Sequence, residues 1–253
     1  ILCHSRNLNE LPTSFLVPIT TRQIPVLSEA VPSKHHRSVD HITSISMRIT
    51  LLISIPASVG MCLFSSPICQ LLLANKPDTA AAAAPLLAAL SLAIAFSSTL
   101  FTTNAILKSF GKPTIPVLNM AIGGVVKIAV SYVLIGFPEI NAMGSAISTV
   151  VSYLLIVILN LIQIRRLMPH MDSTVKTALP MLLSALVMGA ASYAAYFGLC
   201  LFLSPKVAVV PAILLAVVVY GACAVLFRAV TYDDVVLLPK GETLARLLRL
   251  QKH

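Results

Sequence analysis

Six long apolar stretches, separated by short polar connections, occupy the chain between residues 49 and 230. Each stretch is about 20 residues or longer, which at 1.5 Å per residue matches a hydrocarbon core about 30 Å thick. The stretches do not alternate apolar and polar residues as the strands of a membrane barrel do. They predict six membrane-spanning helices, over residues 49–73, 83–106, 115–135, 141–164, 177–203 and 207–230.

The composition agrees with a membrane protein. Hydrophobic residues make up 57% of the 253 residues and charged residues 11%. A soluble domain of this length has too little interior for so much apolar surface, whereas helices in lipid satisfy their own backbone hydrogen bonds. The predicted fold is an all-α, polytopic transmembrane helix bundle over residues 49–230. A basic loop (31–48) precedes it, and a tail (231–253) that contains a short amphipathic helix follows it.

Lysine and arginine are distributed unequally between the connections. One alternating set of connections, together with the C-terminal tail, holds thirteen of these residues, and the opposite set holds only Lys76 and Lys206. The positive-inside rule therefore predicts a multi-pass protein of the cell membrane whose C-terminus is cytoplasmic. The same bias explains the net charge of +9. No basic soluble face remains for nucleic acid, so the lipid bilayer is the expected partner.

The N-terminal region is less regular than the rest. Residues 1–10 begin without Met and resemble neither a signal peptide nor a span, so we expect an atypical remnant there. Residues 11–30 are predicted to form part of a seventh membrane helix, although Arg22 and three prolines interrupt it. We expect the chain to be a fragment or to have lost its true start.

The usual residues of catalytic and metal sites form no convincing group. The five cysteines lack metal-ligand spacing and fit small apolar positions inside helices. His35, His36 and His41 surround Arg37, and a solvated basic loop near anionic headgroups explains them better than a metal site does. There is no nucleophile–base pair and no phosphate-binding glycine loop. We expect no enzyme, no cofactor and no metal.

Lys127 is the most informative polar residue. It lies inside the stretch 115–135, about 12 Å from one end and 18 Å from the other. A central lysine costs about 2.5–3.5 kcal/mol on insertion, while the eleven Ile, Leu and Val residues of this stretch return about 3–7 kcal/mol. A charge retained at this depth normally faces a bundle interior or a wet cavity on a substrate path. The alternative is a structural lysine that bonds to a neighbouring helix.

Small and polar residues extend from Lys127 along two predicted helices. Two such polar lines can form the walls of one aqueous cavity that holds a single positive charge. The alternative is that small and hydroxylated residues only allow membrane helices to pack closely. The lines are Asn119, Gly123, Lys127 and Ser131 in the first helix and Asn141, Ser145, Ser148 and Ser152 in the second, where Asn160 and Gln163 follow.

Five segments carry a resemblance to a known family. They are IPVLSEA (24–30), MRITLLISIPASVG (47–60), TTNAILKSFGKPTIPVLNMAIGGVVKIAVSYVLI (102–135), INAMGSAISTVVSY (140–153) and LPKGETL (238–244). The third, with its GKP turn and central lysine, is the most specific. Through them the chain resembles, from about residue 11 to 250, the C-terminal half of the stage V sporulation protein B branch of the multidrug/oligosaccharidyl-lipid/polysaccharide flippase superfamily.

This resemblance implies a two-lobe flippase, similar to multidrug and lipid II flippases, of which the chain would be the C-terminal lobe. Such proteins are expected to flip lipid-linked glycan precursors for peptidoglycan or polysaccharide assembly by alternating access. Lys127 would bind the substrate's pyrophosphate. The proposed cavity walls are Asn119, Ser131, Asn141 and Ser145. The expected partners are the lipid-linked substrate and the missing N-terminal lobe, without which we expect no transport.

Two alternatives remain open at this point. The first is a cation-coupled multidrug exporter of the same superfamily. It needs carboxylates within the membrane, whereas the seven acidic residues from Asp40 onward fall in predicted connections or the tail. The second is a non-transporting membrane subunit or a pseudogene remnant, which an intact first lobe encoded upstream would exclude.

Overall fold

The computed structural model describes residues 36–73, 77–136, 141–169, 174–201 and 205–226. Within these ranges the chain forms seven α-helices and no strand. The predicted all-α, polytopic bundle is therefore confirmed. The helices are α2 (His36–Leu63), α3 (Ser65–Leu72), α4 (Pro77–Ser109), α5 (Thr114–Ile135), α6 (Asn141–Leu167), α7 (Thr174–Cys200) and α8 (Pro205–Leu226).

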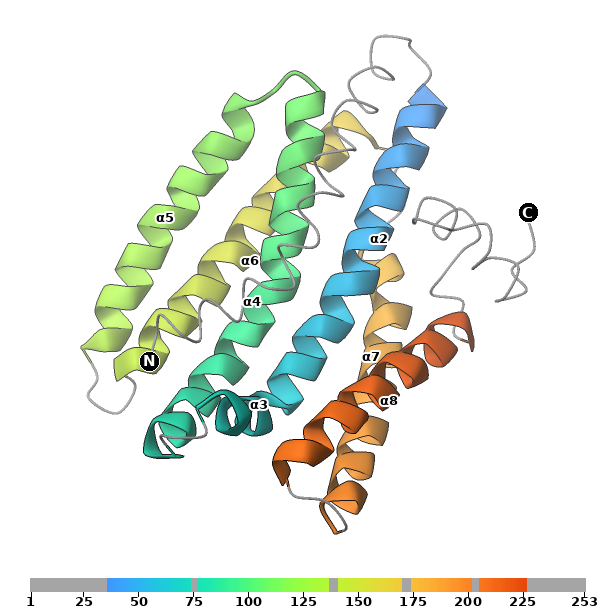
Figure 1. Cartoon of the computed structure of the whole chain (residues 1–253). Coiled ribbons are helices and arrows are strands. Elements are labelled where there is room, and N and C mark those ends of the chain that lie inside the picture. The colour runs from blue at the N-terminus through green and yellow to red at the C-terminus, as the bar shows by residue number, and fades with distance from the viewer. Residues whose placement is uncertain (1–35, 74–76, 137–140, 170–173, 202–204, 227–253) are drawn as a thin grey trace.

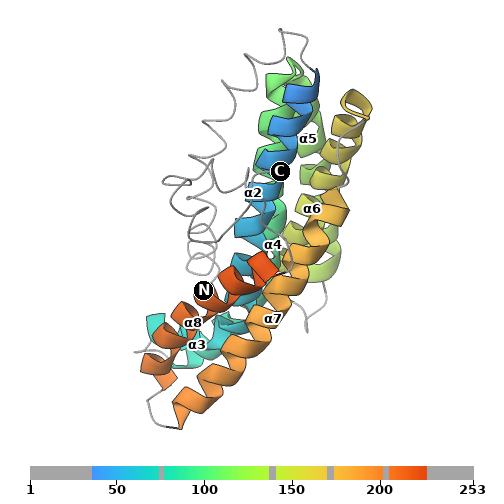
Figure 2. The same ribbon diagram turned by 90° about the vertical axis from the view of Figure 1, so that its right-hand side faces the viewer.

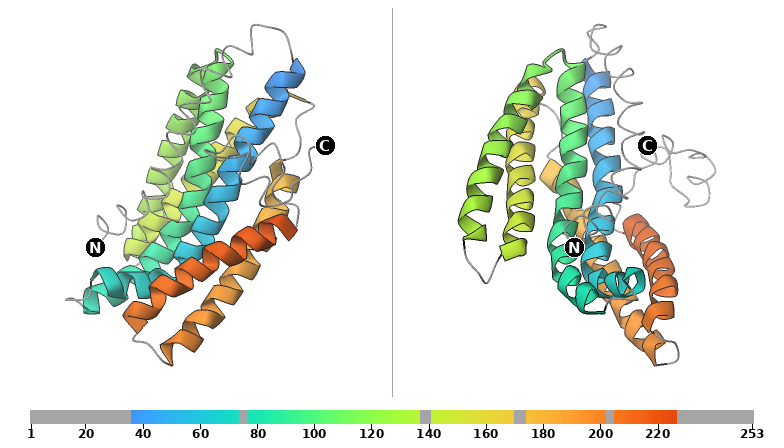
Figure 3. Two further views of the ribbon diagram at one scale, coloured as in Figure 1. Left: turned by 45° about the vertical axis from the view of Figure 1, so that its right-hand side comes forward. Right: turned by 60° about the vertical axis from the view of Figure 1, so that its left-hand side comes forward.

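The six long helices pack as a row whose order differs from their order in the chain. Along the row, α5 packs on α6, α6 on α4, α4 on α2, α2 on α7, and α7 on α8 (Figures 1 and 3). Figure 2 shows α7 and α8 together beside the end of α2 that leads into α3. Consequently α4 and α2 lie in the middle of the row, and α5 forms one edge of it.

Five of these helices are long and apolar enough to cross a membrane, so the chain is a multi-pass membrane protein. They are α2, α4, α5, α6 and α7, and the described apolar part of α8 is the shorter stretch Pro211–Ala224. Because α4 has 33 residues, it is about 50 Å long, which is more than a hydrocarbon core requires.

The first predicted span differs from the structure at both ends. Residues 49–73 do not form one helix: α2 begins at His36, inside the predicted basic loop, and ends at Leu63. A separate helix, α3, then follows across the end of the bundle (Figure 3). Pro67 explains the break, because it has no N–H to donate to the Leu63 carbonyl and its ring would crowd that carbonyl.

Small and hydroxylated residues lie where the helices meet. On α8 the buried positions Ala208, Ala212 and Ala216 recur every four residues, while the bulkier Leu214 and Val218 are exposed. Such a stripe lets backbones approach closely and leaves the large side chains for lipid. Between α2 and α4, the Thr50 and Thr102 hydroxyls are hydrogen bonded at 2.7 Å, and Ser58 Oγ donates to the Ser91 carbonyl at 2.8 Å.

The turn between α4 and α5 is built on Gly111, whose φ is +69°. The Gly111 N–H donates to the Lys108 carbonyl at 3.0 Å, and the Lys112 N–H donates to the Leu107 carbonyl at 3.2 Å. This pair of bonds is a Schellman motif, which places a left-handed residue directly after the helix. Glycine adopts that conformation without the steric cost of a Cβ, so the turn fixes where α4 ends and α5 begins.

Several predictions concern other parts of the chain. The remnant at residues 1–10, the partial helix at 11–30 and the amphipathic tail within 231–253 all lie outside the described residues.

Candidate substrate-binding site

Lys127 lies on α5, the edge helix of the row. The face of α5 that points away from α6 exposes bulky apolar side chains, among them Val125, Ile128 and Tyr132, as expected for contact with acyl chains. Lys127 and Ser131 are half-buried, beside the side of α5 that packs on α6. The structure thus places the ammonium-bearing residue in the middle of a membrane span and at a helix–helix boundary.

Asn119 is buried, and its side chain is engaged with the neighbouring helix. Its Nδ2 donates to Asn160 Oδ1 of α6 at 2.8 Å. Asn160 Nδ2 donates in turn to Thr103 Oγ1 at 3.0 Å and to Asn104 Oδ1 at 2.8 Å, both on α4. The amide predicted as a cavity wall therefore belongs to a network that joins three helices.

The predicted serine line on α6 serves close packing at two of its positions. Ser152 is buried, and its Oγ donates to the Gly123 carbonyl of α5 at 2.8 Å. A Cβ added at Gly123 would overlap Ile156 Cγ1 and Cδ1, so the absence of a side chain permits this approach. Ser148 is also buried, and its Oγ donates to the Ser145 carbonyl within α6 at 3.0 Å.

The predicted site residues are spread along the α5–α6 pair. The two helices are antiparallel, so Asn119 near the start of α5 meets Asn160 near the end of α6. Ser145 is half-buried near the start of α6. Asn141 is the first residue of α6, and its side chain is outside the described set. Lys127 and Ser131, one turn apart, are the most compact part of the predicted site.

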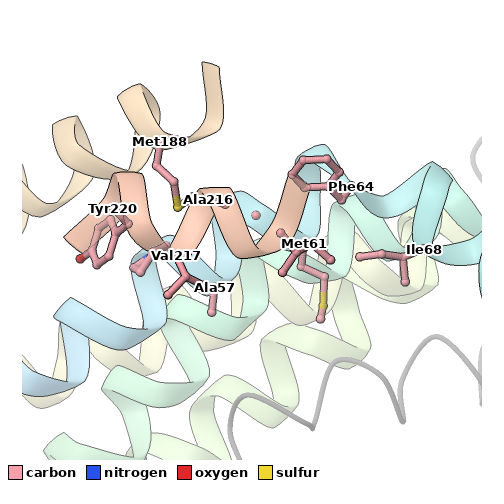
Figure 4. Close-up of a pocket in the computed structure, with 11 residues that line it drawn as sticks. Ala57, Met61, Phe64, Ile68, Met188, Ala216, Val217 and Tyr220 are labelled. Atoms are coloured by element: carbon pink, nitrogen blue, oxygen red, sulfur yellow. The ribbon is translucent and has the colours of Figure 1, made fainter. Parts of the chain in front are cut away.

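A second candidate region is an apolar pocket of about 350 Å³ between α2, α3, α7 and α8 (Figure 4). Among its lining residues only Tyr220 has a polar side chain group, and that hydroxyl donates to the Leu52 carbonyl at 2.8 Å. The lining therefore presents carbon and sulfur to a ligand. It consists of Pro56, Ala57, Gly60, Met61, Phe64, Ile68, Met188, Ile213, Ala216, Val217 and Tyr220.

The pocket follows from the distribution of small residues around it. At Gly189 of α7 an added Cβ would press on the Leu63 side chain of α2, so the two helices approach closely there. Nearby, Ala57, Gly60 and Ala216 leave space unfilled. Sequence reasoning missed this pocket, because apolar residues in a membrane helix give no sign of whether they face lipid, protein or a ligand.

Ionisable chemistry is sparse in the described part of the chain. No three His, Cys, Asp or Glu side chains there are grouped as metal ligands. His35 and the side chains of His36 and His41 lie outside the described set, so the structure does not test that histidine group. Asp78, in the first turn of α4, is the one carboxylate within the five described spans. Cation coupling through carboxylates has little support in these residues.

Comparison with known proteins decides the family. The chain matches the family described as lipid II flippase MurJ over residues 1–225. The chain belongs to this family. It is also 28% identical to the uncharacterized membrane protein YabM of Bacillus subtilis (strain 168), over 97% of this chain and 46% of YabM. The chain thus spans about half the length of that relative. The family is one of transporters, which agrees with the resemblance seen in the sequence.

Proposed function

We propose that this chain is one lobe of a flippase that moves a lipid-linked glycan precursor, of the lipid II or polysaccharide type, across the membrane. The observation that carries the proposal is the match to the lipid II flippase family over residues 1–225. Because the chain spans about half of YabM, we assign transport to this lobe together with a first lobe.

In this proposal Lys127 binds the phosphate part of the substrate headgroup. An ammonium at membrane depth offsets part of the cost of moving phosphate charges out of water. Ser131 lies one turn away and adds a hydroxyl, and Asn141 and Ser145 are further candidate walls. Asn119 is left out of the proposed contacts, because its amide is already bonded to Asn160.

The apolar pocket is proposed to hold part of the substrate's hydrocarbon chain. Its lining of aliphatic side chains, two methionines and Phe64 suits such a ligand, and methionine adapts easily to irregular shapes. Lipid tails are as apolar as the pocket itself, so the substrate's hydrocarbon tail gains no hydrophobic free energy when it moves from the bilayer into the pocket. The pocket would therefore contribute through shape, by orienting the lipid relative to the protein.

The orientation of the lobe is also a proposal. The exposed residues Lys108, Lys112, Arg165 and Arg166 lie at the end of the row that contains the α4–α5 turn and the end of α6 (Figure 1). Basic residues collect on the cytoplasmic side of membrane proteins. This end would face the cytoplasm, and the C-terminus would lie on the same side.

Reconstitution tests the proposed function. The chain would be placed in liposomes with and without a separately expressed first lobe, and flipping of a fluorescent lipid-linked glycan would be followed with an impermeant quencher. We expect flipping only when both lobes are present. Lys127→Met and Lys127→Glu should abolish it, and Lys127→Arg should retain it. Lys108→Met, at an exposed end of α4, is the matched control and should transport normally.

Two results would count against the proposal in different ways. If the paired lobes move no lipid-linked glycan but export a cationic dye along a sodium or proton gradient, the chain belongs to a multidrug exporter. If Lys127→Met flips at the wild-type rate and at equal expression, the lysine is structural and the headgroup site lies elsewhere.

A further inference from the structure

Asn160 is the centre of a closed hydrogen-bond network inside the bundle. It is fully buried, about 10 Å from the C-terminal end of α6 at 1.5 Å per residue. Both donor and acceptor groups of its amide are used: the oxygen accepts from Asn119, and the nitrogen donates to Thr103 and Asn104. One side chain on α6 therefore bonds to α5 on one side and to α4 on the other.

The partners of Asn160 are themselves satisfied. Thr103 Oγ1 donates to the Leu100 carbonyl at 3.0 Å, and Asn104 Nδ2 lies 3.6 Å from Met120 Sδ on α5. A buried polar network whose members all have partners is rigid, because each displaced group would lose a bond that no water replaces. This cluster joins α4, α5 and α6 and fixes their positions relative to one another along the helix axes.

α5 has the smallest buried share of the five described membrane spans, so directional contacts matter most for it among these five. Only 11% of its apolar span is buried, and it packs mainly on α6. Apolar packing against lipid-like side chains tolerates sliding and rotation, whereas an amide hydrogen bond holds one distance and one angle. The Asn119 amide thus fixes the rotation of α5 about its axis, together with the bond from Ser152 Oγ to the Gly123 carbonyl one turn further along α5. Lys127 follows Asn119 by two turns, about 12 Å along the axis.

We propose that Asn160 is a positioning residue, which sets the height and rotation of α5 and thereby the location of the Lys127 side chain along α6. The importance of that location for transport rests on the proposed function. The positioning itself does not, and it can be measured without any substrate.

The experiment uses a reporter cysteine on α5. The five native cysteines are replaced by alanine, Ser131→Cys is introduced one turn from Lys127, and the rate of maleimide labelling is measured in nanodiscs. A second reporter, Ala190→Cys on α7, monitors a helix remote from the network. Asn160→Leu removes the central amide of the network and leaves the side-chain volume nearly constant. Gln163→Leu, on the same helix and outside the network, is the matched control.

We expect Asn160→Leu to change labelling at position 131 by about threefold to tenfold, the population shift that corresponds to losing one or two interhelical hydrogen bonds. Labelling at position 190 should stay constant, and Gln163→Leu should change neither reporter. If Asn160→Leu does not fold, Asn119→Leu removes only the hydrogen bond between α5 and Asn160. It should change the labelling rate at position 131 in the same way.

Equal labelling at position 131 in the wild-type chain, Asn160→Leu and Asn119→Leu would overturn the proposal. A change of similar size at both reporters would also overturn it, because a general loosening of the bundle would then explain the result. Neither outcome depends on which molecule the lobe transports, so the proposed function is tested separately.

Discussion

The close approach of α5 and α6 gives a sharp test of how this membrane bundle is packed. An ideal Cβ on Gly123 would overlap Cγ1 and Cδ1 of Ile156 and would lie 3.2 Å from Ser152 Oγ. The neighbouring Gly124 has no such atom within 4 Å. Gly123→Ala and Gly124→Ala therefore add the same methyl group to adjacent positions of one helix, and only the first addition meets a neighbour.

The two substitutions should have opposite effects on the free energy of unfolding. Alanine improves helix propensity over glycine by about 0.8–1.0 kcal/mol at either position. Overpacking at Gly123 costs about 1–3 kcal/mol, because Ile156 is 4% exposed and has little room to move. Gly124→Ala should therefore be stabilised by up to about 1 kcal/mol. The free energy of unfolding of Gly123→Ala should be about 1–3 kcal/mol lower than that of Gly124→Ala.

Unfolding in mixed micelles, followed by circular dichroism as the fraction of sodium dodecyl sulfate increases, measures this difference. A double-mutant cycle assigns the cause. Ile156→Ala alone leaves a cavity and costs about 2–5 kcal/mol. Combined with Gly123→Ala it should recover most of the overpacking penalty, giving a coupling of about 1–3 kcal/mol. Equal stability of Gly123→Ala and Gly124→Ala, or zero coupling with Ile156, would refute the described contact.

Four further predictions concern stability in the same assay. Gly111→Ala should lose about 1–2 kcal/mol, because its φ of +69° is a left-handed conformation that alanine disfavours. Ser54→Ala should match or exceed the wild type, since the buried Ser54 hydroxyl has no hydrogen-bond partner among the described residues. Ser58→Ala, one turn along, should lose about 0.5–1.5 kcal/mol with its bond between α2 and α4. Tyr220→Phe should lose a similar amount, about 0.5–1.5 kcal/mol, with the bond between α8 and α2.

Each of these predictions can be contradicted by a specific result. Gly221→Ala, in α8 and equally free of neighbours within 4 Å, should be neutral or stabilising. If Gly111→Ala behaves like it, the turn does not require a left-handed residue. A loss of stability in Ser54→Ala as large as that in Ser58→Ala would mean that both hydroxyls are bonded. If Tyr220→Phe unfolds with the same free energy as the wild type, the described bond to Leu52 does not contribute to stability.

The fold class and most of the spans could be predicted from the sequence, because lipid offers the backbone no hydrogen-bond partners. Any apolar stretch of sufficient length must therefore be helical, whatever packs against it. The break between α2 and α3 is also determined locally, by Pro67. It was not predicted, because the chain is apolar on both sides of this proline. The turn at Gly111 is local in the same sense, since glycine there fits the left-handed residue that a Schellman motif needs.

The order of the helices, the engagement of Asn119 and the apolar pocket were decided by tertiary structure. Asn119 bonds to a residue 41 positions away, and Asn160 bonds to one 57 positions away. In a soluble protein the polar side of a helix faces water and so reveals which side is buried. In a membrane both sides are apolar, so the sequence of a single helix does not say which side meets lipid and which meets protein.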